Sequence, residues 1–199
     1  MTVSVANERM AAPGSDTETD LVVRASKGDA EAFDRLIATR LTSSFRLARA
    51  IVGDTREAED VTQEAFVSAW RNLPRLRDPD RFDAWFGRIL VNAARMSVRR
   101  RGPVRSVPVA FRDADDVERQ GPTDPGRPDA GLEGVVAGDA LQRAIDRLSI
   151  GQRTILALHH VEERPVSEVA TILGIPVGTA KWRLYSARAA LERAMESER

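Results

Sequence analysis

The sequence predicts an all-α protein made of two helical bundle domains joined by a long flexible acidic linker. Apolar residues recur at helical spacing through residues 20–101 and 135–199, and no segment there shows the alternation of a strand. Between them, residues 102–134 are rich in Pro, Gly and Asp, which interrupt regular elements. Loops of this length are uncommon inside one compact domain, so two domains are favoured. The remaining segment, 1–19, is expected to be a disordered tail.

Composition excludes several classes of function. The chain has 199 residues, equal numbers of acidic and basic residues (30 each) and no cysteine. A disulfide framework, a thiolate zinc site and a cysteine nucleophile are therefore excluded. No apolar run approaches the roughly 20 residues that span a bilayer, and the N-terminus lacks the pattern of a secretory signal. We expect a cytoplasmic protein with no direct membrane insertion.

Three helices are expected in the first domain, over residues 29–52, 55–73 and 81–101. The second of these begins with Thr55, a plausible N-cap, and carries Glu57 early, where the helix dipole favours acids. All three place apolar residues at the spacing of one buried face.

Four shorter helices are expected in the second domain. They cover 139–148, 151–163, 166–174 and 177–195. Gly174 stands where a chain reversal requires a positive φ, and Pro176 stands near the start of the last helix, where its missing N–H costs little. Two helices across such a turn form a helix-turn-helix pattern.

The last helix has an outward face that combines aromatic and charged residues. Its apolar stripe is Ala180, Leu184, Ala187 and Leu191, and the positions opposite are Lys181, Trp182, Tyr185 and Ser186, with Arg183 beside them. Cations reach phosphates and base edges, and apolar rings contact thymine methyls, so this face suits a DNA groove. The alternative is that Trp182 packs against the linker or the other bundle.

A second polar stripe follows the third helix of the first domain. Arg88, Asn92, Arg95 and Arg99 recur at helical pitch along one face. Arginines at this pitch can follow a phosphate backbone, and an asparagine can hydrogen-bond a base. A solvated face is the alternative, but two basic helices in one chain favour nucleic acid.

A third polar group lies in the 55–73 helix, where Asp60, Gln63 and Glu64 are opposite an apolar stripe. It is either a docking face or plain solvated surface. A di-metal site in a helical bundle usually includes an inward Glu-x-x-His, which is missing here, so no metal is expected. His159 and His160 lack partners at ligand spacing. No phosphate loop or serine elbow is present, so we expect no cofactor and no enzymatic active site.

These segments, in this order, resemble the extracytoplasmic-function (ECF) group of bacterial sigma factors. "EAEDVTQEAFVSAWRNL" is similar to their polymerase-binding segment, "RFDAWFGRILVNAARMSVRRR" to their minus-ten helix, and residues 148–191 to their minus-thirty-five domain. The chain departs from the family's usual residues at Met96, Pro165 and Trp182.

The resemblance implies a role for each polar face. Asp60, Gln63 and Glu64 would bind core RNA polymerase. Arg88, Asn92, Arg95 and Arg99 would contact the melted minus-ten DNA, and Lys181, Trp182, Arg183, Tyr185 and Ser186 the upstream element. The partners expected are therefore core RNA polymerase, promoter DNA and an anti-sigma factor. Two alternatives are a conventional helix-turn-helix regulator that binds duplex DNA alone and a helical protein-interaction module.

Overall fold

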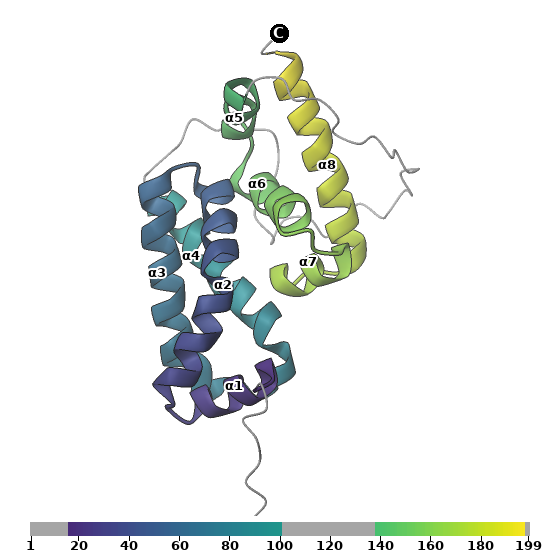
Figure 1. Ribbon diagram of the computed structural model, residues 1–199. Coiled ribbons are helices and arrows are strands. Elements are labelled where there is room, and N and C mark those ends of the chain that lie inside the picture. Colours follow the sequence, from purple (N-terminus) through teal and green to yellow (C-terminus); the bar gives the residue numbers. More distant parts are fainter. Residues whose placement is uncertain (1–15, 101–137, 198–199) are drawn as a thin grey trace, which may run out of the picture.

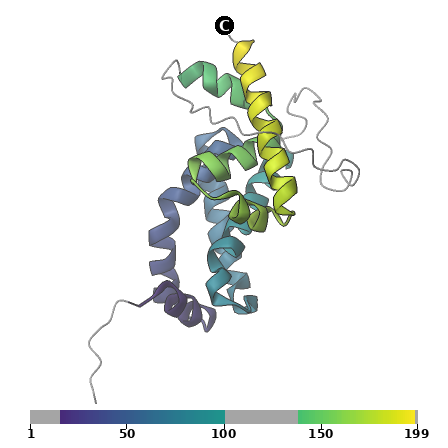
Figure 2. The same cartoon turned by 90° about the vertical axis from the view of Figure 1, so that its right-hand side faces the viewer.

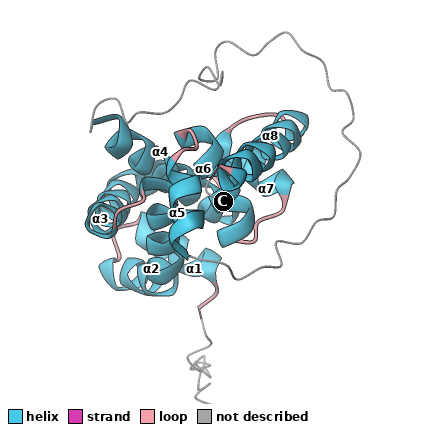
Figure 3. Ribbon diagram, turned by 90° about the horizontal axis from the view of Figure 1, so that it is seen from above, coloured by secondary structure: helices cyan, strands magenta, loops and turns pink. Residues whose placement is uncertain are grey.

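The structure is a computed structural model that describes residues 16–100 and 138–197. Within these two ranges every regular element is helical, as the colouring of Figure 3 shows. The predicted all-α class is confirmed. The expected linker, 102–134, and most of the expected tail lie outside the described residues.

The first bundle contains four α-helices. They are α1 (Glu18–Ser26), α2 (Ala30–Val52), α3 (Thr55–Asn72) and α4 (Phe82–Arg100), with short 3₁₀ turns at Leu73–Arg75 and Pro79–Arg81 before α4. Helices α2, α3 and α4 match the three that the sequence predicts. Helix α1 was not predicted from the sequence. It crosses one end of the bundle in Figure 1.

Helix α1 begins inside the segment predicted to be a tail. Thr17 and Asp20 form a capping box, in which the Asp20 amide donates to the Thr17 hydroxyl at 3.2 Å and the Thr17 amide donates to the Asp20 carboxylate at 3.1 Å. Because both donors are satisfied, the helix starts at Glu18, and the predicted tail at 1–19 extends too far.

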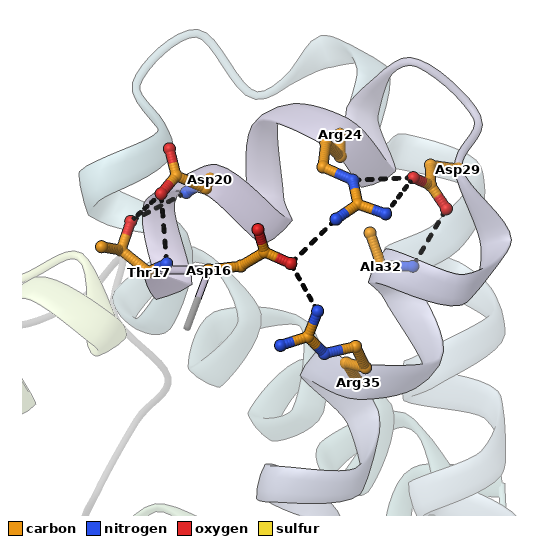
Figure 4. Close-up of polar contacts among 7 residues, drawn as sticks. All are labelled: Asp16, Thr17, Asp20, Arg24, Asp29, Ala32 and Arg35. Carbon is orange, nitrogen blue, oxygen red and sulfur yellow. Dashed lines mark hydrogen bonds and ion pairs between the residues drawn. The ribbon is translucent and has the colours of Figure 1, made fainter. Parts of the chain in front are cut away.

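A small charged network fastens α1 to α2 (Figure 4). The Asp16 carboxylate accepts from Arg24 at 2.8 Å and also from Arg35 on α2. Arg24 bonds in addition to Asp29 at 2.7 Å, and Asp29 caps α2 by accepting from the Ala32 amide at 3.1 Å. These groups are partly exposed, so the network orients α1 more than it stabilises the bundle.

The junction between α2 and α3 corrects one expectation. Gly53 ends α2 in the left-handed region at φ 82°. The next residue, Asp54, is extended and accepts from the Glu57 amide at 2.9 Å, so it is the N-cap of α3. Thr55, the expected cap, is the first helical residue. Both residue types are good caps, and the chain reversal at Gly53 decides which one occupies the position.

The core of the first bundle is formed by the inward faces of α2, α3 and α4. Leu36 and Leu90 are almost fully buried there. The rings of Phe66 and Phe86 stack with their centroids 5.1 Å apart and join α3 to α4. Such aromatic pairs stabilise the folded state by about 0.5–1.5 kcal/mol beyond the contribution of the apolar area that they bury.

The second bundle has four α-helices and one π-helical turn. They are α5 (Gly138–Asp146), α6 (Ile150–Leu156), the π turn (Ala157–Val161), α7 (Val166–Leu173) and α8 (Val177–Glu196). Gly174 between α7 and α8 has φ 68°, and Pro176 is the N-cap of α8. The helix-turn-helix prediction is therefore confirmed, including its left-handed glycine.

The two bundles pack against each other. In Figures 1 and 2, α7 lies beside α4, and α8 is on the outer side of the second bundle. One continuous cluster of buried apolar side chains extends from α2 and α4 into α6 and α7. The Gly87 backbone of α4 faces Ile172 of α7, which is 1% exposed. The sequence predicts two bundles but does not predict this contact.

Candidate nucleic-acid interface

The outward face of α8 carries the aromatic residues that the sequence placed there. Trp182 is 42% exposed and Tyr185 is 46% exposed, and Lys181 is exposed beside them. Arg183 and Ser186 are partly buried, so these two expected positions lie at the margin of the face rather than at its centre. Of the opposite stripe, Ala180, Leu184 and Ala187 are buried and Leu191 is partly buried, which fixes how α8 is rotated in the bundle.

The polar stripe of α4 is present but not uniformly accessible. Asn92 and Arg99 are exposed, and Arg95 is half-buried. The guanidinium of Arg88 lies on the C-terminal end of α7. Its Nη2 donates to the Thr171 carbonyl at 2.7 Å, and its Nε donates to the Ile172 carbonyl at 3.2 Å.

These carbonyls are among the last of α7, where the helix dipole is negative, and the Thr171 carbonyl also accepts from the Gly174 amide at 3.3 Å. A cation bonded to them is therefore well placed. Arg88 is the first residue of the expected nucleic-acid stripe, and its guanidinium is hydrogen-bonded to the second bundle.

The polar face of α3 is open to solvent. Asp60, Gln63 and Glu64 are all exposed, and Val61 and Ala65 are buried on the opposite side, as predicted. Glu64 pairs with Arg100 of α4 at 3.0 Å, and both side chains are more than half exposed. This surface pair contributes little energy, so Glu64 can exchange Arg100 for another partner at low cost.

An ion pair that the sequence did not indicate lies between the bundles. Arg164, just before α7, donates to both carboxylate oxygens of Asp83 on α4, with Nη2 to Oδ1 at 3.1 Å. Its Nη1 also contacts Glu168 at 3.3 Å. The hydrogen bonds from Arg164 hold the pKa of Asp83 below its usual value, against the opposite effect of burial. The two-pronged geometry makes this a directional contact.

Beside that pair, Arg46 of α2 reaches the end of the π turn. It donates to the Val161 carbonyl at 3.1 Å and lies 3.7 Å from the Glu162 carboxylate. Burial raises the pKa of Glu162, and Arg46 opposes that rise only in part. Together with Asp83–Arg164 and Arg88, this contact makes the interface between the bundles partly ionic.

Comparisons with known proteins match both bundles. Residues 36–104 match Sigma-70 region 2, and residues 138–191 match Sigma-70 region 4. The RNA polymerase sigma-H factor of Pseudomonas aeruginosa is 31% identical over 91% of this chain and 95% of its own length. The ECF sigma factor SigM of Mycobacterium tuberculosis is 30% identical over 89% and 84%. The chain belongs to the ECF group of the sigma-70 family.

Solved structures agree with that assignment. The structure of CnrH in complex with the cytosolic domain of CnrY has a TM-score of 0.64, with 25% identity over 92% of this chain and 99% of that one. The sigma factor RpoE of Bartonella quintana, solved with the anti-sigma factor NepR, shares the fold at a TM-score of 0.59 and 24% identity. The family makes this ECF sigma factor a DNA-binding transcription initiation factor, and the alternative of a conventional regulator is not favoured.

The described part of the ECF sigma factor has no group of three or more His, Asp or Glu side chains placed to hold a metal ion. No helix among the described residues is long and apolar enough to cross a membrane. His159 contacts the Arg164 carbonyl at 2.8 Å, and His160 accepts from Arg188 at 3.2 Å. Both histidines therefore have structural partners.

Sequence reasoning missed Asp83 and Arg164. Each looks like an ordinary surface charge in its own segment, and the two are 81 positions apart. Only the spacing of Arg164 four residues before Glu168 was visible in the sequence, and it predicts a local helix pair rather than a contact with α4.

Proposed function

We propose that this ECF sigma factor joins core RNA polymerase in the cytoplasm and selects promoters through two separate DNA contacts. The observation that supports this most directly is that one chain, which matches regions 2 and 4, carries two outward polar helix faces, one on α4 and one on α8. The chain supplies binding energy for promoter recognition and opening, and the polymerase supplies the chemistry.

The upstream element is contacted by α8. Lys181, Arg183 and Ser186 provide polar contacts to phosphates and base edges, and Trp182 and Tyr185 provide apolar contacts in the groove. The exposure of both rings supports this assignment, because large aromatic side chains at neighbouring outward positions are unusual on a purely solvated face.

The minus-ten element is contacted by α4. Asn92 is free to hydrogen-bond an unpaired base, and Arg95 and Arg99 follow the backbone. Arg88 joins them once it leaves the carbonyls of α7. Stacking is sequence-tolerant, so polar side chains such as Asn92 are the ones that distinguish bases.

Core polymerase is bound by the exposed face of α3. Asp60, Gln63 and Glu64 are acidic or polar, are open to solvent and need no rearrangement of the bundle to reach a basic partner surface. We further propose an anti-sigma protein as a regulatory partner, because CnrH was solved with CnrY and the Bartonella quintana RpoE with NepR.

The test is reconstitution of the purified chain with bacterial core polymerase on a library of genomic fragments. We expect transcripts that share two spaced motifs upstream of their start sites. Tight binding of the chain alone to duplex DNA, without polymerase-dependent transcripts, would instead support the conventional regulator.

Two sets of variants assign the faces. Asp60→Arg with Glu64→Arg is expected to abolish capture of core polymerase, whereas Asp34→Arg, an exposed change on α2, is not. Undiminished capture by the double variant would contradict the α3 assignment.

Trp182→Ala is expected to weaken recognition of the upstream motif and to leave polymerase capture intact. Glu192→Ala is the control, because it is exposed on the same helix about 15 Å further along. Equal loss of both functions, with a fall in thermal stability, would show that the ring of Trp182 acts in packing.

A further inference from the structure

The second bundle covers one side of the polar stripe of α4 and leaves the other side open. Arg88 is bonded to the last carbonyls of α7, and Nη2 of Arg95 lies 4.0 Å from the position that a Cβ on Gly151 of α6 would occupy. Asn92, between these two arginines in the sequence, is exposed. The accessible face of α4 is therefore the one that extends from Asn92 away from α6 and α7.

Met96 lies on this open side. It follows Asn92 by four residues, which places it about 6 Å further along the helix axis and about 40° further round the helix, away from the second bundle. Trp85 and Ile89 occupy the same side of α4, three and two turns earlier, and both are partly buried against the core. Met96 is 50% exposed, so the core leaves this large apolar side chain to solvent.

The surroundings of Met96 are basic. From Gly87 to Arg100, α4 contains four arginines and no acidic residue, and one of these arginines, Arg100, pairs with Glu64 of α3 at 3.0 Å. An apolar protein surface is a poor partner here, because docking it would remove water from the guanidinium groups. Nucleic acid suits both features: its phosphates attract the arginines, and the 5-methyl group of thymine is an apolar group on a base edge.

We propose that Met96 determines specificity in the minus-ten contact, and that its side chain packs on the 5-methyl group of a thymine while Asn92 hydrogen-bonds a nearby base. The inference rests on the proposed function, since it names the base that the same face of α4 prefers. The rise of about 6 Å between the two residues is roughly twice the 3.4 Å of one nucleotide in a stacked strand. The thymine is therefore two nucleotides from the base that Asn92 contacts in a stacked strand, and closer in an unstacked one.

The preference is a property of this chain, because Met96 is one of its departures from the family's usual residues. Cytosine, the other pyrimidine, has no methyl group to offer Met96, so thymine is favoured over cytosine at this position.

The test compares thymine with uracil, which differ only in that methyl group. Holoenzyme is assembled from core polymerase and the full chain and is bound, at fixed salt, to a promoter fragment that yields polymerase-dependent transcripts. Each thymine of the minus-ten motif, on either strand, is replaced in turn by deoxyuridine. We expect one replacement to weaken binding about fourfold, the factor that burial of one methyl-sized group contributes.

Variants of Met96 show whether this residue forms the protein side of the contact. Met96→Gln keeps the length of the side chain but makes it polar, and we expect it to bind the thymine and uracil fragments equally. Met96→Leu stays apolar at similar volume, and we expect it to retain most of the discrimination. Because every variant is compared on the same two fragments, effects of the methyl group on the DNA itself cancel.

Leu41→Ala is the matched control. It removes another exposed apolar side chain, on α2 and outside the α4 face, and should retain the full discrimination between thymine and uracil. All variants should capture core polymerase equally and keep their helical content by circular dichroism.

Three results would overturn the inference. They are equal binding of the thymine and uracil fragments by the unaltered holoenzyme, discrimination that survives in Met96→Gln, and discrimination that is lost in Leu41→Ala as well. Each of these leaves promoter-dependent initiation intact, so the proposed function would stand. Absence of polymerase-dependent transcripts from every genomic fragment would reject the proposed function and this inference together.

Discussion

Replacing Gly87 by alanine separates the stability of the first bundle from its docking to the second. A Cβ at Gly87 would lie 3.2 Å from Cδ1 of Ile172, 3.3 Å from its Cγ1 and 3.6 Å from its Cγ2. Ordinary carbon contacts are about 3.5–4.0 Å, so Ile172 must move by a few tenths of an ångström. Because Ile172 is 1% exposed within α7, we expect a cost at the low end of overpacking, about 1 kcal/mol.

The same substitution has an opposite effect on α4 itself. Glycine in a helix interior is less stable than alanine by about 0.5–1 kcal/mol, and Gly87 has no left-handed backbone to preserve. This gain exists whether or not the bundles touch, whereas the clash with Ile172 exists only when they do. The two effects therefore appear in different measurements.

In the undocked state we expect Gly87→Ala to raise the thermal unfolding midpoint of the first bundle by up to about 4–8 °C, from a gain near 1 kcal/mol. We expect it to lower the equilibrium constant for docking of the two bundles about fivefold, as measured by energy transfer between labels at Glu59→Cys on α3 and Glu192→Cys on α8, both exposed positions in a chain without cysteine. Gly178→Ala is the control, because a Cβ there meets nothing within 4 Å, and it should leave docking unchanged. A docked fraction unaffected by Gly87→Ala would refute the steric argument and would mean that α4 and α7 are not in close contact in solution.

Two further predictions concern local structure. Asp54→Ala should lower the free energy of unfolding by about 1 kcal/mol, because it removes the cap of α3. Thermal melting should show a smaller loss of stability for Thr55→Ala. A larger loss for Thr55→Ala than for Asp54→Ala would instead identify Thr55 as the cap. The pKa of His160 is lowered, mainly by desolvation and further by Arg188 and His159, so the unfolded chain binds more protons just below pH 6.5. The free energy of unfolding should therefore fall as pH decreases through 6.5, and it should fall less in His160→Gln. Denaturant unfolding of both proteins at pH 7.5 and 5.5 measures this difference. Identical pH dependence in the two proteins would argue against a role for His160.

The fold class and the helix-turn-helix were accessible from the sequence because their determinants are local. Apolar periodicity gave the buried stripe of α8 and hence the exposure of Trp182 and Tyr185. Gly174 was predicted to be left-handed because few other residues adopt that backbone conformation at low cost. The exposed face of α3 followed from the same periodicity.

Local patterns failed where two choices were chemically similar or where an element was short. Asp54 and Thr55 are both good caps, and the sequence alone did not say which residue would follow the end of α2. Helix α1 has nine residues, too few for its periodicity to stand out, and its position depends on contacts of Asp16 and Arg24 with α2.

By itself the sequence determined two helical bundles, their outward polar faces and the turn that joins α7 to α8. The tertiary structure alone decided that the bundles dock, that Arg88 lies on the carbonyls of α7, and that Asp83 meets Arg164 across 81 positions. The physical reason is that helix periodicity and backbone preference act within a few residues. A docked surface depends instead on shape and charge brought together from distant segments, which no local pattern encodes.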